Sequence, residues 1–82
     1  MFTLFFSERA KKQLVKLPQD IQPRILSALD RIRVRPEDYV KKLVGESAYS
    51  LRVGDYRVIM DIDRNKLLIL VIKVGHRRNV YQ

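Results

Sequence analysis

The sequence contains no cysteine and no tryptophan, and His76 is its only histidine. The absence of cysteine excludes a disulfide framework, a thiolate metal site and thiol chemistry. One histidine is too few for a histidine-rich metal site within one chain. Acidic residues are also scarce, because nine Asp and Glu stand against 17 Lys and Arg, a formal net charge of +8. Such a charge favours a polyanionic partner, most commonly nucleic acid, with a membrane surface or an acidic protein as the alternatives.

Long hydrophobic runs are missing as well. The longest, residues 67–72, has the length of a strand, whereas a membrane-spanning helix needs about 20 apolar residues. Residues 1–6 are apolar but lack the basic flank and cleavage site of a signal peptide. No phosphate-binding glycine loop and no zinc-protease or serine-hydrolase motif occurs, so we expect no cofactor. We expect a cytoplasmic protein without a membrane partner, folded as one domain over residues 1–82.

The first half of the chain predicts one short strand and two helices. Residues 2–6 are rich in aromatic side chains, which is typical of a strand. Ser7 is a suitable N-cap for a helix that Pro18 then stops. Asp20 can cap a second helix, which Pro36 ends. Because the link between them is short, we expect the helices to form an antiparallel hairpin.

The second half predicts three strands. Apolar and polar residues alternate on both sides of a turn at Gly54 and Asp55, and a fully apolar run follows. Residues 37–44 are ambiguous and could form a helical turn closed by Gly45. The predicted fold is therefore α+β, with an N-terminal strand and an antiparallel helical hairpin packed on one face of a mostly antiparallel four-stranded sheet. The three predicted strands are residues 49–53, 56–62 and 67–74.

Basic side chains from distant parts of the chain are expected to meet at one end of this sheet. Arg52 and Arg57 flank the predicted turn on neighbouring strands. If the last two strands pair antiparallel, Arg57 lies opposite the end of the last strand, close to residues 73–77. Since the helices cover one face, we expect Arg52 and Arg57 to line the open face.

The composition of this cluster fits a site that cleaves RNA. Guanidinium groups bind phosphate in a bidentate geometry and stabilise the charge that develops on it. Histidine ordinarily titrates near neutral pH, and a tyrosine hydroxyl can exchange a proton. Such a set suits attack of a ribose 2′-OH on the neighbouring phosphate without a metal ion. The candidate catalytic residues are Arg57, Arg77, His76 and Tyr81, and the candidate phosphate-binding residues are Arg52, Lys73 and Arg78.

Each candidate also has a structural interpretation. The two arginines after the last strand could be a solvated basic tail, and the histidine beside them could be structural. The tyrosine near the C-terminus could be a packing residue. Arg52 and Arg57 could instead pair with Asp55 and Asp61 across the strands. The arginines of the second helix predict a solvated face, with ribosomal RNA or an acidic partner as a secondary interpretation; they are Arg24, Arg31, Arg33 and Arg35.

Two motifs give the chain a family resemblance. The first is the G-D-Y-R turn within residues 51–59, and the second is the G-H-R-R-x-V-Y ending within residues 74–81. The F-F-S opening before the first helix and the L-P step before the second accompany them. Together they resemble the RelE/ParE superfamily of toxins from toxin–antitoxin systems, over essentially the whole chain.

The resemblance implies the same fold and a RelB-like antitoxin that wraps around the toxin. For the RelE branch it implies cleavage of messenger RNA in the ribosomal A site. By position, Arg57 resembles the phosphate-binding arginine of the family, and Arg77 resembles the arginine credited with stabilising charge in the transition state. Tyr81 resembles the tyrosine that stacks on a base or assists the 2′-OH. Arg52 matches a basic position, and His76 stands where relatives have lysine or histidine.

Two departures from the family pattern bear on activity. Ala48 and Ser50 stand where the best-known RelE toxins have lysines, so the lysine proposed as the general base is missing. Glu46 is a substitute candidate, or equally a plain loop residue. The chain also stops one residue after Tyr81, so we expect no C-terminal helix.

The superfamily is divided by function. ParE toxins share the fold, poison DNA gyrase and lack the nuclease cluster. Because the arginines and the tyrosine of the RelE site are present, the sequence favours a ribosome-dependent mRNA endonuclease that forms a hetero-oligomer with its antitoxin. The alternatives are a ParE-like gyrase poison, and a non-catalytic relative that binds only antitoxin and DNA.

Overall fold

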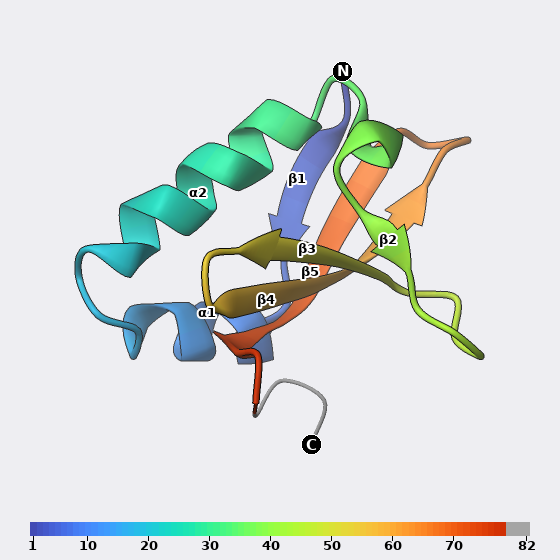
Figure 1. The fold of residues 1–82 in the computed structure, drawn as a ribbon. Helices are drawn as coiled ribbons and strands as arrows, with labels where there is room; N and C mark the ends of the chain where they lie inside the picture. The colour runs from blue at the N-terminus through green and yellow to red at the C-terminus, as the bar shows by residue number, and fades with distance from the viewer. Residues whose placement is uncertain (79–82) are drawn as a thin grey trace.

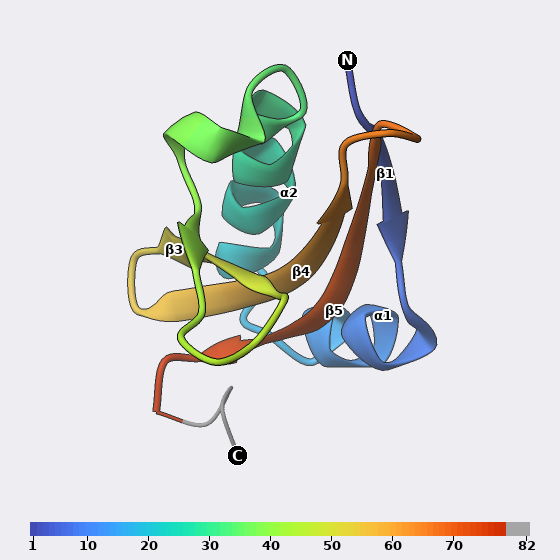
Figure 2. The same cartoon turned by 90° about the vertical axis from the view of Figure 1, so that its right-hand side faces the viewer.

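The computed structural model describes residues 1–78, in which two α-helices pack on a five-stranded sheet (Figures 1 and 2). The strands lie in the order β1-β5-β4-β3-β2, with β1 parallel to β5 and every other pair antiparallel. The elements are β1 (Thr3–Phe6), α1 (Glu8–Val15), α2 (Ile21–Ile32), the 3₁₀ turn η1 (Pro36–Asp38), β2 (Lys41–Lys42), β3 (Tyr49–Val53), β4 (Tyr56–Asp63) and β5 (Leu68–His76).

The predicted α+β class and the packing of both helices on the sheet are confirmed, but the sheet has one more strand than predicted. The additional strand is β2, within the segment that was ambiguous in the sequence and could have formed a helical turn. Only η1 is helical there, and Lys41 and Lys42 pair antiparallel with Ser50 and Tyr49. A strand of two residues carries no periodicity of its own, so it forms because β3 lies beside it.

Local signals explain where both helices begin and end. The Ser7 hydroxyl accepts a hydrogen bond of 3.0 Å from the Ala10 amide, which confirms the predicted N-cap of α1. Asp20 does occupy the N-cap of α2, but its side chain makes no capping bond. Instead, Gln22 Nε2 donates to the Leu17 carbonyl at 2.9 Å. This bond connects the first turn of α2 to the segment that follows α1, and so helps to hold the two helices together.

One hydrophobic core lies between the helices and the sheet. Burial of each large aliphatic side chain in it contributes roughly 1.5–3 kcal/mol before entropy is subtracted. The buried side chains of α2, which are Ile25, Leu29 and Ile32, supply one side of this core. No helix in the described part of the chain is long and apolar enough to cross a membrane. The buried core residues are Phe2, Ala10, Ile25, Leu29, Ile32, Leu51, Val58, Met60, Ile69, Val71 and Val74.

β5 contains a bulge at the point where its neighbour changes from β1 to α1. The β4–β5 register shifts between Ile59 and Met60, which leaves Ile72 as the extra residue of β5. The Ser7 hydroxyl donates to the Ile72 carbonyl at 2.9 Å, and Gln13 Oε1 accepts from the Val74 amide at 2.8 Å. The side chains of Ser7, the N-cap of α1, and of Gln13, in the second half of α1, thereby hold the part of β5 that leads into the candidate site.

Candidate phosphate-binding site

The strand register brings the two predicted arginine groups together. Arg52 pairs directly with Arg57 across β3 and β4, and Arg57 pairs with Gly75 across β4 and β5. Beyond β5, the Arg77 amide donates a 2.9 Å hydrogen bond to the Asp55 carbonyl in the β3–β4 turn. The expected proximity of these segments is therefore confirmed.

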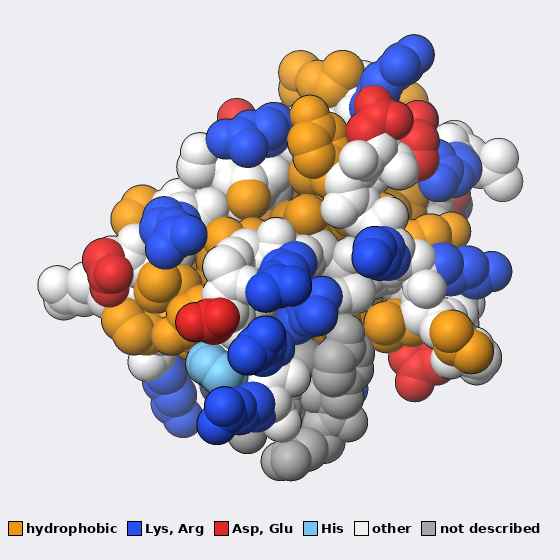
Figure 3. Space-filling view, viewed as in Figure 1, with side chains coloured by type: hydrophobic (Ala, Val, Ile, Leu, Met, Phe, Trp, Pro, Cys, Tyr) orange, Lys and Arg blue, Asp and Glu red, His pale blue; other side chains and the backbone are white. Residues whose placement is uncertain are grey.

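Arg52, Arg57 and Lys73 lie on the sheet face turned away from the helices. Their strand neighbours Leu51 and Val58 belong to the core, and side chains alternate between the two faces. Lys73 pairs with the outer-face residue Ile59 one row further along the sheet. In Figure 3, Lys and Arg side chains gather over this end of the sheet, with the pale-blue histidine at the margin of the cluster.

The cationic groups of this face have no carboxylate partner within residues 1–78. The three ion pairs of the described chain are elsewhere, at Lys11–Glu8, Arg33–Asp30 and Arg64–Glu37. The alternative that Arg52 and Arg57 pair with Asp55 and Asp61 is therefore wrong for the described structure. Arg52 Nε donates instead to the Gly54 carbonyl at 3.0 Å. The buried Nε of Arg57 has no hydrogen-bond acceptor among the described residues.

His76 projects from the opposite face of the same sheet end. It pairs with Tyr56, and the two rings meet edge to face with centroids 5.6 Å apart. His76 Nδ1 accepts a hydrogen bond of 3.3 Å from the Arg78 amide, so the proton of the neutral ring lies on Nε2. The register therefore separates the His76 ring from Arg57, although adjacency in the sequence grouped them.

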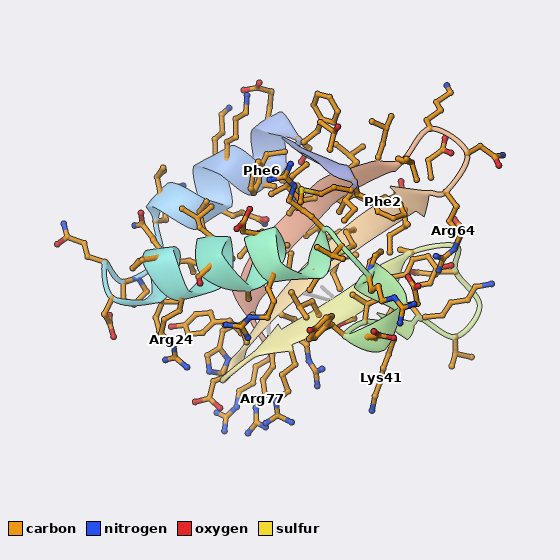
Figure 4. All side chains as sticks on the ribbon, turned by 90° about the horizontal axis from the view of Figure 1, so that it is seen from above. Phe2, Phe6, Arg24, Lys41, Arg64 and Arg77 are labelled. Carbon is orange, nitrogen blue, oxygen red and sulfur yellow. The ribbon has the colours of Figure 1, made fainter. Side chains whose placement is uncertain are left out.

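The remaining candidates follow β5. Arg77 and Arg78 are both exposed, and Figure 4 shows Arg77 extending beyond the sheet end, away from Phe6, with other nitrogen-tipped side chains beside it. Neither forms an ion pair within the described chain. Tyr81 lies outside the described residues.

A small pocket opens on the outer face beside Arg57. Its volume is about 150 Å³, and three strands (β2, β3 and β4) and the end of η1 contribute to its wall. Tyr39 and Lys41 line it and were not among the predicted site residues, because their segment was ambiguous in the sequence, with a helical turn as one possibility. The basic pair at residues 41–42 was the only available signal, and it could not be placed without the β2–β3 pairing. The lining residues are Tyr39, Lys41, Ser50, Arg52 and Arg57.

The helix arginines divide into two groups. Arg24 and Arg31 line a groove of about 460 Å³ between α2 and β3, which Arg52 also borders. Gly54 has a positive φ of +60°, and a β-carbon there would lie 3.3 Å from the Arg24 guanidinium. Arg33 has a structural role, because Nε donates to the Phe2 carbonyl at 2.9 Å and Nη1 pairs with Asp30.

Comparison with known proteins agrees with this geometry. The family described as "ParE toxin of type II toxin-antitoxin system, parDE" matches residues 4–81. The chain belongs to the RelE/ParE superfamily of type II toxins. Toxin RelG of Mycobacterium tuberculosis is 32% identical, over 99% of this chain and 97% of the relative.

Solved structures place this superfamily member among RelE toxins. The toxin in the intact E. coli RelBE toxin–antitoxin complex is 30% identical over 93% of this chain and 96% of its own, with a TM-score of 0.78. The archaeal RelE–RelB complex from Pyrococcus horikoshii OT3 gives 28% identity over 96% and 98%, with a TM-score of 0.80. In both structures the matched toxin fold is determined together with an antitoxin.

Proposed function

We propose that this toxin is a ribosome-dependent endonuclease that cleaves messenger RNA in the A site. The proposal rests on the environment of the Arg57 side chain. Its guanidinium group lies beside Arg52 on the sheet face turned away from the helices. It has no carboxylate partner in the described structure, and its buried Nε lacks an acceptor there. A buried cationic donor without a partner is costly to a protein, so a phosphate oxygen is the acceptor that best fits it.

The proposed reaction is attack of a ribose 2′-OH on the adjacent phosphate. The 2′ oxygen forms a bond to phosphorus and loses its proton, while the bond from phosphorus to the 5′ oxygen breaks and that oxygen gains a proton. The products are a 2′,3′-cyclic phosphate and a 5′-hydroxyl. Arg57 and Arg77 bind the scissile phosphate and stabilise its added negative charge, and no metal or cofactor is required.

The other candidates support this step. Arg52, Lys73 and Arg78 hold the phosphates that flank the reacting one. We assign proton transfer to His76 or Tyr81, and Nε2 is the His76 atom that carries the exchangeable proton when Nδ1 accepts from the Arg78 amide. Since the chain has few groups that titrate near neutrality, we assign the completion of the site to the ribosome.

The same basic face is the proposed target of an antitoxin. A RelB-like chain laid over it would cover the cations and form a toxin–antitoxin hetero-oligomer in the cytoplasm. The net charge of +8 favours both an acidic antitoxin and the ribosome. Both associations would weaken as salt concentration rises.

Cell-free translation followed by primer extension on the message tests the proposal. We expect cuts within codons at stalled ribosomes, no cuts on naked RNA, and loss of the cuts in Arg57→Ala. Arg9→Ala is the matched control, since Arg9 is exposed on α1 and the change in charge is the same. Circular dichroism of each variant separates loss of the site from loss of the fold.

An intact message in the presence of the wild-type toxin would overturn the nuclease proposal. The matching family carries the ParE name, so a gyrase supercoiling assay is the next measurement in that case. Inhibited supercoiling would assign the toxin to ParE-like gyrase poisoning. Unaffected supercoiling would leave binding to antitoxin and DNA as its activity.

A further inference from the structure

We propose that the outer-face pocket of about 150 Å³ is a nucleotide-binding subsite, in which Lys41 binds a backbone phosphate and Tyr39 stacks on the neighbouring base. The inference rests on the proposed function in one respect, namely that the ligand is single-stranded RNA. It adds two residues that lie outside both family motifs, on the short strand and turn that the sequence did not predict.

The position of Lys41 follows from the β2–β3 register. Lys41 pairs with Ser50, so it shares the outer face with Ser50 and with Arg52 two residues further along β3. Lys42 pairs with Tyr49, which packs against the core, so its side chain leaves the strand on the other face. Two adjacent lysines of equal charge and similar exposure are thus directed to opposite sides of the sheet.

The pocket concentrates positive charge. Lys41, Arg52 and Arg57 all line it, and none of its lining residues is acidic. Neighbouring strands lie about 4.8 Å apart, which is well within the reach of a lysine side chain, so the Lys41 ammonium on β2 can reach the flanking phosphate assigned to Arg52 on β3. Ser50 on β3 stands where the best-known RelE toxins have a lysine. Its cross-strand partner Lys41 on β2 supplies an ammonium group beside that position.

The buried Nε of Arg57 indicates what the pocket binds. Among residues 1–78 no acceptor reaches this atom, and no carboxylate pairs with any cation of the pocket. A phosphodiester oxygen satisfies such a donor and remains negatively charged at any physiological pH. An uncharged ligand would leave the three cations unbalanced, so the chemistry favours an anionic backbone.

Tyr39 supplies the part of the pocket that fits a base. It follows η1, where its amide donates to the Pro36 carbonyl at 3.0 Å, so its backbone is held in place. The residue is 48% exposed although it is large and aromatic, and it lines the pocket beside the cations. An aromatic ring next to a basic groove is the usual platform for an unpaired base.

Binding of a short RNA to the free toxin tests the subsite without depending on cleavage. The probe is a trinucleotide with 2′-O-methyl groups, which lacks the attacking hydroxyl and cannot be cut, and nuclear magnetic resonance titration at low salt gives its Kd. We expect Lys41→Ala to raise Kd by about ten-fold and to lower the slope of log Kd against log salt concentration by about 0.7, as expected for one lost phosphate contact. Lys42→Ala carries the same change in charge and should leave both quantities within about two-fold of wild type.

Two variants at Tyr39 test the stacking contact separately. Tyr39→Leu should raise Kd by about ten-fold without changing the salt slope, because it removes the ring and no charge. Tyr39→Phe keeps the ring and should bind as wild type does.

The outcomes separate this inference from the proposed function. Equal effects of Lys41→Ala and Lys42→Ala would overturn the subsite, as would an absence of trinucleotide binding or normal binding by Tyr39→Leu. RNA binding with the expected pattern of variants, together with an uncut message on the ribosome, would uphold the subsite and reject the endonuclease.

Discussion

Arg52 and Arg57 face one another as direct cross-strand partners on the outer face of the β3–β4 hairpin. Like charges in this position destabilise a sheet by roughly 0.2–1 kcal/mol, and here no carboxylate in the described chain offsets them. A local conflict of this kind, within a sheet that is otherwise well packed, is expected where stability has been given up for binding. The pair therefore predicts opposite effects of mutation on stability and on activity.

Arg57→Met tests this relationship most directly. Methionine retains the apolar stem of the side chain and removes the guanidinium, so the fold should be as stable as wild type or up to about 1 kcal/mol more stable. Cleavage at stalled ribosomes should fall by about 100-fold or more, because one charge-stabilising group is lost. Chemical denaturation and primer extension give the two values.

Arg52→Met is the matched comparison, since it relieves the same repulsion from the other strand. It should give a smaller gain in stability, because it also removes the hydrogen bond from Arg52 Nε to the Gly54 carbonyl, and a smaller loss of cleavage. A loss of stability in both variants would show that the two guanidinium groups are not in conflict, and the argument for a binding role would lose its basis.

Gln13 should be more important for stability than an ordinary polar residue on a helix surface. Its Oε1 accepts from the Val74 amide, beyond the point at which β1 stops pairing with β5. Gln13→Leu leaves this part-buried amide without an acceptor, so we expect a loss of about 1–3 kcal/mol in the free energy of unfolding. Hydrogen exchange at Val74 should be faster, since its amide would no longer be bonded. Gln19→Leu, at an exposed turn position, should change neither measurement, and equal effects at both sites would contradict the role of Gln13.

The sequence predicted the geometry of this site where local signals decide it. The turn at residues 54–55 and the alternation on either side of it lead directly to the pairing of Arg52 with Arg57. The face on which His76 lies needed the register, because the pairing of Arg57 with Gly75 sets the alternation at the end of β5. Adjacency in the sequence cannot show this.

The pocket residues could not be predicted for a different reason. Residues 41–42 form a strand only because residues 49–50 lie beside them, and that pairing is invisible to a window read along the chain. Tyr39 and Lys41 therefore join the site through tertiary structure alone.

His76→Asn tests whether this histidine transfers a proton or only supports the end of β5. The asparagine side-chain oxygen can replace Nδ1 as the acceptor of the Arg78 amide, while the exchangeable proton of the ring is lost. If His76 transfers a proton, cleavage should fall by about 100-fold or more, and the pH dependence of the rate should become flatter. His76→Phe retains the edge-to-face contact with Tyr56 and provides the complementary variant. Normal cleavage in both variants would assign proton transfer to Tyr81 or to the ribosome.

The ion pair between Glu37 and Arg64 predicts a defined response to acid. It joins η1 to the β4–β5 loop at 3.3 Å, across 27 positions of sequence. A hydrogen bond from the Glu37 backbone amide, and then the Arg64 guanidinium, hold the pKa of this carboxyl below its ordinary value of 4.5. Because the folded pKa is lowered, the stabilising contribution is fully present above 4.5 and is lost as the pH falls through the folded value.

Glu37→Gln should therefore have a lower melting temperature than wild type at neutral pH. The two melting temperatures should become equal once the Glu37 carboxyl is protonated in both the folded and the unfolded protein. Thermal melting from neutral pH down to about pH 2 gives the comparison. The difference in melting temperature between the variant and wild type should disappear only at a pH below the ordinary pKa of a carboxyl group. Glu46→Gln is the control, because Glu46 is exposed and forms no ion pair in the part of the chain that the structure describes. A difference in melting temperature that grows as the pH falls would have the wrong sign for this ion pair. Other groups would then hold η1 against the β4–β5 loop, and the position of Tyr39 in the pocket would not depend on the Glu37–Arg64 ion pair.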